Sequence, residues 1–306
     1  MLHSPLGAQA GPFDLDDDAT YPRWRAWKLA CAPADAQALT VDLTDPRALS
    51  AGEREALLQR IAQSNTALYR SSVVAEDKDL PRALAAQLGL RQLDANWLAD
   101  EDGVSQIRVS AESDGRGGFI PYTDRPIRWH TDGYYHPAER RIRGMVLHCV
   151  RPARHGGVNG LLDHELAYIA LRDASPEHVR ALMQPDAMTI PARADDDGVA
   201  RPAQSGPVFS VDAADGQLHM RYTARTRSIE WKADAATRAA VACLEALLAG
   251  PMPGLLHVQL QAGMGLVGHN VLHERSAFED DPAQPRLLYR ARFLDRAQLP
   301  AEPPWR

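Results

Sequence analysis

From about residue 104 onward, the sequence is a succession of short strand-like segments separated by turns rich in glycine and proline. The expected strands cover residues 104–110, 127–131, 143–150, 208–211, 217–222, 255–260, 265–267 and 287–293. Many short strands with such turns are typical of jelly rolls and barrels, whereas a parallel α/β sheet would need a helix between successive strands. The pattern therefore predicts a mainly β chain with helical insertions (α+β) and a jelly-roll, cupin-like core.

Helical segments flank and interrupt these strands. Ser50 and Glu53 have the spacing of a capping box, and apolar residues then recur at helical spacing. Asp234 and Gly250 are suited to begin and to end a helix that has an apolar stripe. The other expected helices cover residues 80–88, 164–172 and 177–183, and two further strands are expected at residues 39–43 and 67–70.

The sequence contains no internal repeat and no convincing linker, so we expect a single domain over residues 1–306. A chain of this length can bury a large core. Residues 1–38 open with an aspartate-rich stretch, and we expect them to form a peripheral N-terminal arm or a short helix laid on the body. Residues 185–206 are the best candidate for a mobile lid loop.

Composition argues against several classes of partner. The net charge is -6 and no basic block is present, so a nucleic-acid surface is not expected. No apolar run approaches the roughly 20 residues that span a bilayer, and residues 1–7 do not have the pattern of a secretory signal. Cys31, Cys149 and Cys243 are scattered, which indicates reduced thiols. We therefore expect a cytoplasmic protein that binds a small molecule.

A histidine and an aspartate lie two residues apart at the end of one expected strand, in the stretch Trp129-His130-Thr131-Asp132. Successive side chains of an extended chain point to opposite faces, so His130 and Asp132 share one face. A neutral imidazole nitrogen and a carboxylate oxygen that converge in this way can form two-thirds of a metal site. Without further ligands, the same pair could simply be hydrogen-bonded on a barrel strand.

The third ligand must come from a distant strand. His273 is the clearest candidate, and His269 in the same segment is its rival. Two histidines and one carboxylate occupy one face of an octahedron and leave three positions open, as in Fe(II) enzymes that bind a chelating cosubstrate and dioxygen. A structural zinc ion would instead need four ligands, usually with cysteine, and no cysteine here is suitably placed.

Taken together, these motifs resemble the TauD/TfdA family of Fe(II)- and 2-oxoglutarate-dependent dioxygenases, within the γ-butyrobetaine hydroxylase-like superfamily. The resemblance rests on His130-Thr131-Asp132, on Gly156-Gly157-Val158-Asn159 followed by Asp163, and on the run from Asn270, His273, Glu274, Arg275 and Phe278 to Arg286 and Arg290. It covers about residues 122–293 and implies a double-stranded β-helix flanked by helices. It also implies Fe(II) bound by His130, Asp132 and His273, with 2-oxoglutarate as cosubstrate and O2 as co-reactant.

The resemblance further implies an arginine that holds the distal carboxylate of 2-oxoglutarate, and Arg286 is the best match. A guanidinium suits this role because it is permanently charged and can bind a carboxylate in a bidentate manner. Relatives commonly have a threonine after the Gly-Gly turn, where this chain has Asn159. An asparagine amide can donate a similar hydrogen bond, or Asn159 can be a plain turn residue.

For the substrate, the resemblance implies a small anionic or zwitterionic molecule, such as an amino acid, betaine, sulfonate or phosphonate. Arg290 matches the arginine that contacts the anionic group in sulfonate-using relatives. Tyr134, Tyr135 and Arg225 are further candidates for the pocket wall. Related halogenases lack the carboxylate ligand, so Asp132 favours hydroxylation, or a desaturation or cleavage that begins with the same hydrogen abstraction.

Two alternatives remain open at this point. One is a zinc-dependent hydrolase or isomerase on the same barrel, and the other is a non-catalytic homologue that only binds a ligand. Relatives are often oligomers, so a homodimer or homotetramer is also allowed.

Overall fold

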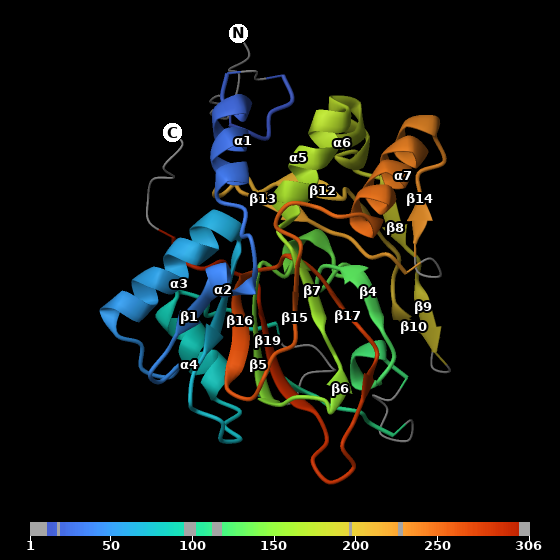
Figure 1. Ribbon diagram of the computed structural model, residues 1–306. Helices are drawn as coiled ribbons and strands as arrows, with labels where there is room; N and C mark the ends of the chain where they lie inside the picture. Colours follow the sequence, from blue (N-terminus) through green and yellow to red (C-terminus); the bar gives the residue numbers. More distant parts are fainter. Residues whose placement is uncertain are drawn as a thin grey trace.

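A six-stranded sheet and a four-stranded sheet lie at the centre of the computed structural model (Figure 1). The structure describes residues 11–16, 19–94, 102–111, 118–195, 198–225 and 229–299. The six-stranded sheet has the order β1 (Thr40–Asp42), β2 (Thr66–Arg70), β16 (Met264–His269), β5 (Gly144–Arg151), β19 (Leu287–Phe293) and β3 (Val104–Ile107). The four-stranded sheet has the order β15 (Leu256–Val258), β7 (Asn159–Leu162), β17 (Leu272–Arg275) and β4 (Ile127–His130).

The pairing of these strands is antiparallel except for β1 with β2, which is parallel. Neighbours in the sheets are far apart in the sequence, since β16 lies between β2 and β5, and β17 lies between β7 and β4. The C-terminal strands therefore complete both sheets. This arrangement brings residues near position 130 next to residues near position 273.

The two sheets enclose an apolar layer. Side chains of the large sheet alternate between its two faces, and Met145, Cys149 and Leu288 belong to the same buried cluster as Leu161 and Leu256 of the small sheet. The opposite face of the large sheet is covered by α3 (Ala51–Ser64) and α4 (Leu80–Gln87). Burial on both faces explains why these strands carry apolar residues at successive positions.

A helical layer packs at one end of the sheets (Figure 1). It consists of α1 (Tyr21–Ala30), α5 (His164–Ala174), α6 (Pro176–Leu182) and α7 (Ala235–Ala249), and it shares a core with β8 (Met188–Ile190), β12 (Phe209–Val211) and β13 (Leu218–Met220). In the predicted N-terminal arm, α1 is anchored rather than loosely attached. Trp24 is buried in the core, and the buried Lys28 ammonium contacts the carboxylates of Asp163 and Glu165 at 2.6 and 2.5 Å.

Local sequence signals predicted the helix ends well. The capping box of Ser50 and Glu53 is formed, and the Asp234 carboxylate accepts a hydrogen bond from the Thr237 amide at 2.7 Å. Pro176 begins a new helix, because a proline cannot continue the hydrogen-bond ladder of α5. The short α2 (Ala36–Leu39) precedes β1, so the strand expected at residues 39–43 begins one residue later.

The segment expected as a lid loop, residues 185–206, contains β8 together with β9 (Arg193–Asp195), β10 (Gly198–Arg201) and β11 (Gln204–Gly206). β9 pairs with β10, while β8 pairs with β11 and with β14 (Glu230–Trp231). Short paired strands therefore make up much of the segment that was predicted as a long mobile loop or lid, and its mobility and lid role stay predictions. The short pieces β6 (His155–Gly156) and β18 (Phe278–Glu279) also pair, and two 3-10 turns lie at Ile120–Tyr122 and Ala138–Arg140. Over the described residues, no helix combines the length and apolar character needed to cross a membrane.

Candidate metal centre and cosubstrate pocket

Three potential metal ligands converge at the end of the four-stranded sheet. His130 in β4 and His273 in β17 lie directly opposite each other in the antiparallel pairing, and their ring centroids are 4.2 Å apart. Asp132 follows two residues after His130. The ligand atoms of His130, Asp132 and His273 all lie within 4.8 Å of one another. A cross-strand pair plus one residue on the same face thus forms a facial set of two nitrogens and one oxygen.

Backbone carbonyls orient both histidines. The Nδ1 atom of His130 lies 2.9 Å from the Arg128 carbonyl, and that of His273 lies 2.9 Å from the Val271 carbonyl. Because a carbonyl can only accept, each Nδ1 carries the proton and each Nε2 is left as a lone-pair donor for a metal. Burial, aided by the neighbouring His273, lowers the pKa of His130 to about 3, and burial also lowers the pKa of His273. Both imidazoles are therefore neutral, as metal ligands must be.

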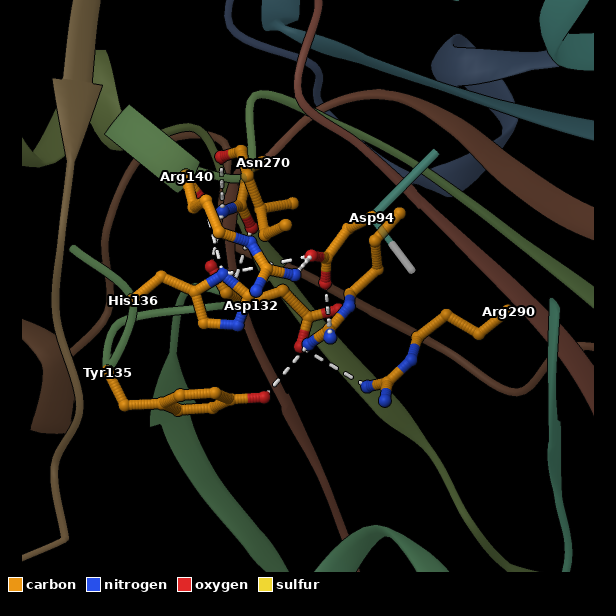
Figure 2. Close-up of polar contacts among 9 residues, drawn as sticks. Asp94, Asp132, Tyr135, His136, Arg140, Asn270 and Arg290 are labelled. Atoms are coloured by element: carbon orange, nitrogen blue, oxygen red, sulfur yellow. Dashed lines mark hydrogen bonds and ion pairs between the residues drawn. The ribbon is translucent and has the colours of Figure 1, made fainter. Parts of the chain in front are cut away.

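Asn270 holds Asp132 by its backbone (Figure 2). Its Oδ1 accepts from the Asp132 amide at 2.8 Å, and its Nδ2 donates to the carbonyls of Asp132 and Ile142 at 2.8 and 2.9 Å. The side chain of Asp132 is buried, and its Oδ1 accepts from the Arg290 Nη1 at 3.2 Å. Burial alone would raise the pKa of Asp132, but Arg290 and Arg292 hold it below its usual range. Asp132 is therefore a carboxylate.

His269, the rival for the third position, lies elsewhere. Its Nδ1 is 2.8 Å from the Asn65 Oδ1, and its backbone belongs to β16 of the large sheet. The structure thus places His273, and not His269, with His130 and Asp132. His269 instead belongs to a buried polar chain in which the Asn65 Nδ2 donates to Asp163.

Arg286 and Asn159 occupy buried positions, as a cosubstrate site requires. Arg286 precedes β19, and its guanidinium lies 4.9 Å from the centre of the Phe278 ring. Its Nη1 is buried without a hydrogen-bond partner, and burial lowers its pKa to about 10. Asn159 begins β7, and its Nδ2 lies 3.4 Å from the Val258 carbonyl. The asparagine amide is thus directed toward the neighbouring strand β15.

The structure locates the four residues expected near the substrate. Arg290 lies beside Asp132, and Tyr134 and Tyr135 are half-buried with their rings in a T-shaped contact. The Tyr135 hydroxyl accepts from the Arg292 Nη1 at 3.1 Å. Arg225 is exposed, and it lies two residues beyond Thr223, which bridges to His130. A substrate contact for Arg225 stays a prediction.

Sequence reasoning missed an arginine–aspartate cluster beside the candidate metal ligands. Asp94 is fully buried, and its carboxylate accepts from Arg292 at 2.6 Å and from Arg140 (Figure 2). The signal was available in β19, where positions 288, 290 and 292 share one face. Nothing local marked Asp94 as the partner, because it is 198 residues away from Arg292.

The described residues fit Fe(II) and 2-oxoglutarate. The Asp132 Oδ2 is buried without a hydrogen-bond partner, so one carboxylate oxygen remains for a metal beside the two imidazoles. The orphaned Nη1 of Arg286 likewise calls for an anionic partner, since an unpaired buried charge is costly.

Comparison with known proteins agrees with this chemistry. The family described as "Taurine catabolism dioxygenase TauD, TfdA family" matches residues 29–292. The chain belongs to the TauD/TfdA family. It is an Fe(II)- and 2-oxoglutarate-dependent dioxygenase that acts on a small molecule.

Relatives of this TauD/TfdA enzyme include a uridine-5'-phosphate dioxygenase from a Streptomyces species, which is 32% identical over 212 residues, 66% of this chain and 73% of the relative. An Amycolatopsis uridine-5'-phosphate dioxygenase is 33% identical over 201 residues, 62% of this chain and 68% of the relative. Asparagine oxygenase in complex with Fe(II), 3-hydroxyasparagine and succinate matches with a TM-score of 0.57 at 17% identity, covering 90% and 92% of the two chains. The non-heme iron oxygenase OrfP with Fe, succinate and (3S)-hydroxy-L-Arg matches with a TM-score of 0.58 at 18% identity, covering 80% and 81%. The solved structures show a shared fold.

Proposed function

We propose that this dioxygenase hydroxylates a small anionic molecule and that Arg290 holds the anionic group beside the metal. The observation that carries the proposal is the position of Arg290, whose Nη1 lies 3.2 Å from the metal ligand Asp132. The Arg290 Nε is buried without a hydrogen-bond partner. A guanidinium with buried donors next to a metal centre suits an oxyanion, which it can bind in a bidentate manner.

The neighbouring cation has a different task. Arg292 is committed to Asp94 and to the Tyr135 hydroxyl, with contacts of 2.6 and 3.1 Å. These contacts hold the hydroxyl of Tyr135, which lies three residues after Asp132, against Arg292. Of these two arginines, Arg290 therefore offers its donors to a ligand, while Arg292 is held by Asp94 and Tyr135.

When bound, Fe(II) and 2-oxoglutarate supply the oxidising power: O2 and 2-oxoglutarate are consumed, CO2 and succinate are released, and one oxygen atom enters the substrate C–H bond. The chain supplies position and charge. His130 and His273 each offer an Nε2, Asp132 offers its free Oδ2, and Arg286 holds the distal carboxylate of the cosubstrate. Arg290 holds the anionic group of the substrate and so sets which substrate carbon lies near the metal. Because Asp132 fills the carboxylate position, we infer hydroxylation rather than halogenation.

Phosphate monoesters of nucleosides are the first substrate class to test, because two relatives at 32% and 33% identity are uridine-5'-phosphate dioxygenases. A phosphate suits the oxyanion role that Arg290 offers. Amino acids, betaines, sulfonates and phosphonates are the other anionic or zwitterionic candidates.

The test measures succinate release with Fe(II), ascorbate and O2 across these compound classes. We expect one anionic class to stimulate succinate release, and Arg290→Gln to abolish this stimulation while the affinity for 2-oxoglutarate stays unchanged. Arg172→Gln, which alters a buried arginine of α5, is the matched control and keeps the stimulation. Equal losses of stimulation and of 2-oxoglutarate affinity in Arg290→Gln would contradict the assigned role.

We also infer that the two central sheets are the two walls of a double-stranded β-helix, since β4 and β17 carry the metal ligands at one end and β19 carries the arginines. The shared cores between all layers support one domain. A lid role for residues 185–206, a homodimer or homotetramer and a cytoplasmic location stay predictions. The three cysteines are free, which agrees with a reducing compartment.

A further inference from the structure

A second buried arginine, Arg275, lies next to the expected cosubstrate arginine. Arg275 ends β17, two residues after the ligand His273, so both side chains project from the same face of the strand. Its cross-strand neighbour on β7 is Asn159. The guanidinium of Arg275 lies 4.7 Å from the centre of the Phe278 ring, and that of Arg286 lies 4.9 Å from the same ring. One aromatic ring therefore contacts both cations.

The hydrogen bonds of Arg275 are only partly satisfied. Its Nη2 donates to the carbonyls of Thr123 (2.8 Å) and Arg125, which holds the guanidinium in place. Its Nε and Nη1 are buried without a partner, as is the Nη1 of Arg286. Unpaired buried donors on a charged group are expensive, and they are expected where a ligand supplies the acceptors.

The charges of the two arginines also call for an anion. Both guanidiniums are buried and contact the same ring, so their charges repel each other. Burial lowers the pKa of Arg286 to about 10, although Cys149 and Asp280 oppose the shift. A carboxylate between the two guanidiniums would remove this repulsion and pair the free donors.

Asn159, which stands where relatives have a threonine, is not positioned to donate a second hydrogen bond to such a carboxylate. Its Nδ2 is directed to the Val258 carbonyl at 3.4 Å, and not to the space beside Phe278. Gly157 lies against the same two residues, since a Cβ there would be in ordinary contact with the Phe278 Cβ at 3.5 Å and the Arg286 Nε at 3.6 Å.

The geometry points to Arg275 as a second cosubstrate-binding residue: the distal carboxylate of 2-oxoglutarate is held between Arg275 and Arg286 over Phe278. Arg275 then supplies the contact for which Asn159 is not positioned. The inference concerns the cosubstrate and is independent of the substrate class proposed for Arg290.

The test is calorimetric titration of the Mn(II)-loaded protein, which binds the cosubstrate without turnover. Two ligands are compared: 2-oxoglutarate, and oxalate, which can chelate the metal but has no distal carboxylate. For Arg275→Gln we expect a roughly 10- to 100-fold weaker affinity for 2-oxoglutarate and an unchanged affinity for oxalate. Arg172→Gln is the matched control, because it removes a buried arginine that also donates to a backbone carbonyl, that of Pro12 at 2.9 Å, far from the metal ligands.

If Arg275 has only a structural role, through Thr123 and Arg125, its replacement would lower the affinities for 2-oxoglutarate and oxalate equally or would change neither. Either result overturns the inference. If Arg275→Gln does not fold, a crystal structure of the unaltered protein with Mn(II) and 2-oxoglutarate decides the question. The distal carboxylate must then lie within hydrogen-bond distance of both guanidiniums, and contact with Arg286 alone refutes the inference. Failure here leaves the succinate-release test of Arg290 unaffected.

Discussion

Replacing Asn270 by alanine should lower both the stability of the protein and its affinity for a metal, although none of the three candidate ligand side chains is changed. Asn270 makes three hydrogen bonds of 2.8 to 2.9 Å, two with the backbone of Asp132 and one with the Ile142 carbonyl. Each bond contributes about 0.5–1.5 kcal/mol net, and the partners left behind are buried. The free energy of unfolding should therefore fall by roughly 2–5 kcal/mol. The position of the Asp132 carboxylate would also loosen.

The metal affinity reports the looser position of the Asp132 carboxylate separately from the loss of stability. Loss of a group that orients a ligand typically costs about 10- to 100-fold in metal affinity, and we expect a loss in that range for Asn270→Ala. Urea unfolding of the metal-free protein gives the stability, and Mn(II) titration under native conditions gives the affinity.

A core variant serves as the control for general destabilisation. Leu244→Ala in α7 removes a fully buried side chain and should cost about 2–5 kcal/mol, but it lies in the helical layer and should leave metal affinity unchanged. If Asn270→Ala and Leu244→Ala change metal affinity to the same extent, the positioning argument is refuted. The same holds if Asn270→Ala binds Mn(II) as tightly as the unaltered protein.

Three further outcomes are expected. Lys28→Met should lower the free energy of unfolding by roughly 3–5 kcal/mol in urea titrations, because the buried carboxylate of Asp163 and the partly buried one of Glu165 lose their cation. A smaller loss would mean that water reaches these carboxylates. The metal-free protein should lose stability as the pH falls from 6.5 toward about 3, because over this range His130 becomes protonated in the unfolded chain but stays neutral where it is buried in the folded protein. His130→Gln should therefore flatten the dependence of the unfolding free energy on pH. Asp132→Ala should abolish 2-oxoglutarate-dependent hydroxylation while the fold measured by circular dichroism persists, and retained hydroxylation would contradict its role as a ligand.

Local spacing allowed several features to be predicted from the sequence. The capping box at Ser50 and the N-cap at Asp234 depend only on residues three positions apart, and both are present in the structure. The shared face of His130 and Asp132 follows from the alternation of an extended chain. These predictions succeed because the atoms that interact belong to the same few residues of backbone.

The choice between His269 and His273 was decided only by tertiary structure. Both histidines lie in the same short segment, but β16 pairs with the large sheet, whereas His273 in β17 faces His130. Strand register between distant segments is set by the packing of both sheets, and no spacing rule contains it. The same reason explains why Asp94 beside Arg292 was missed, and why the strands within residues 185–206 were expected as a loop. The sequence by itself determined the kinds of side chain available for the metal and the cosubstrate, while the register of the sheets determined which of them meet.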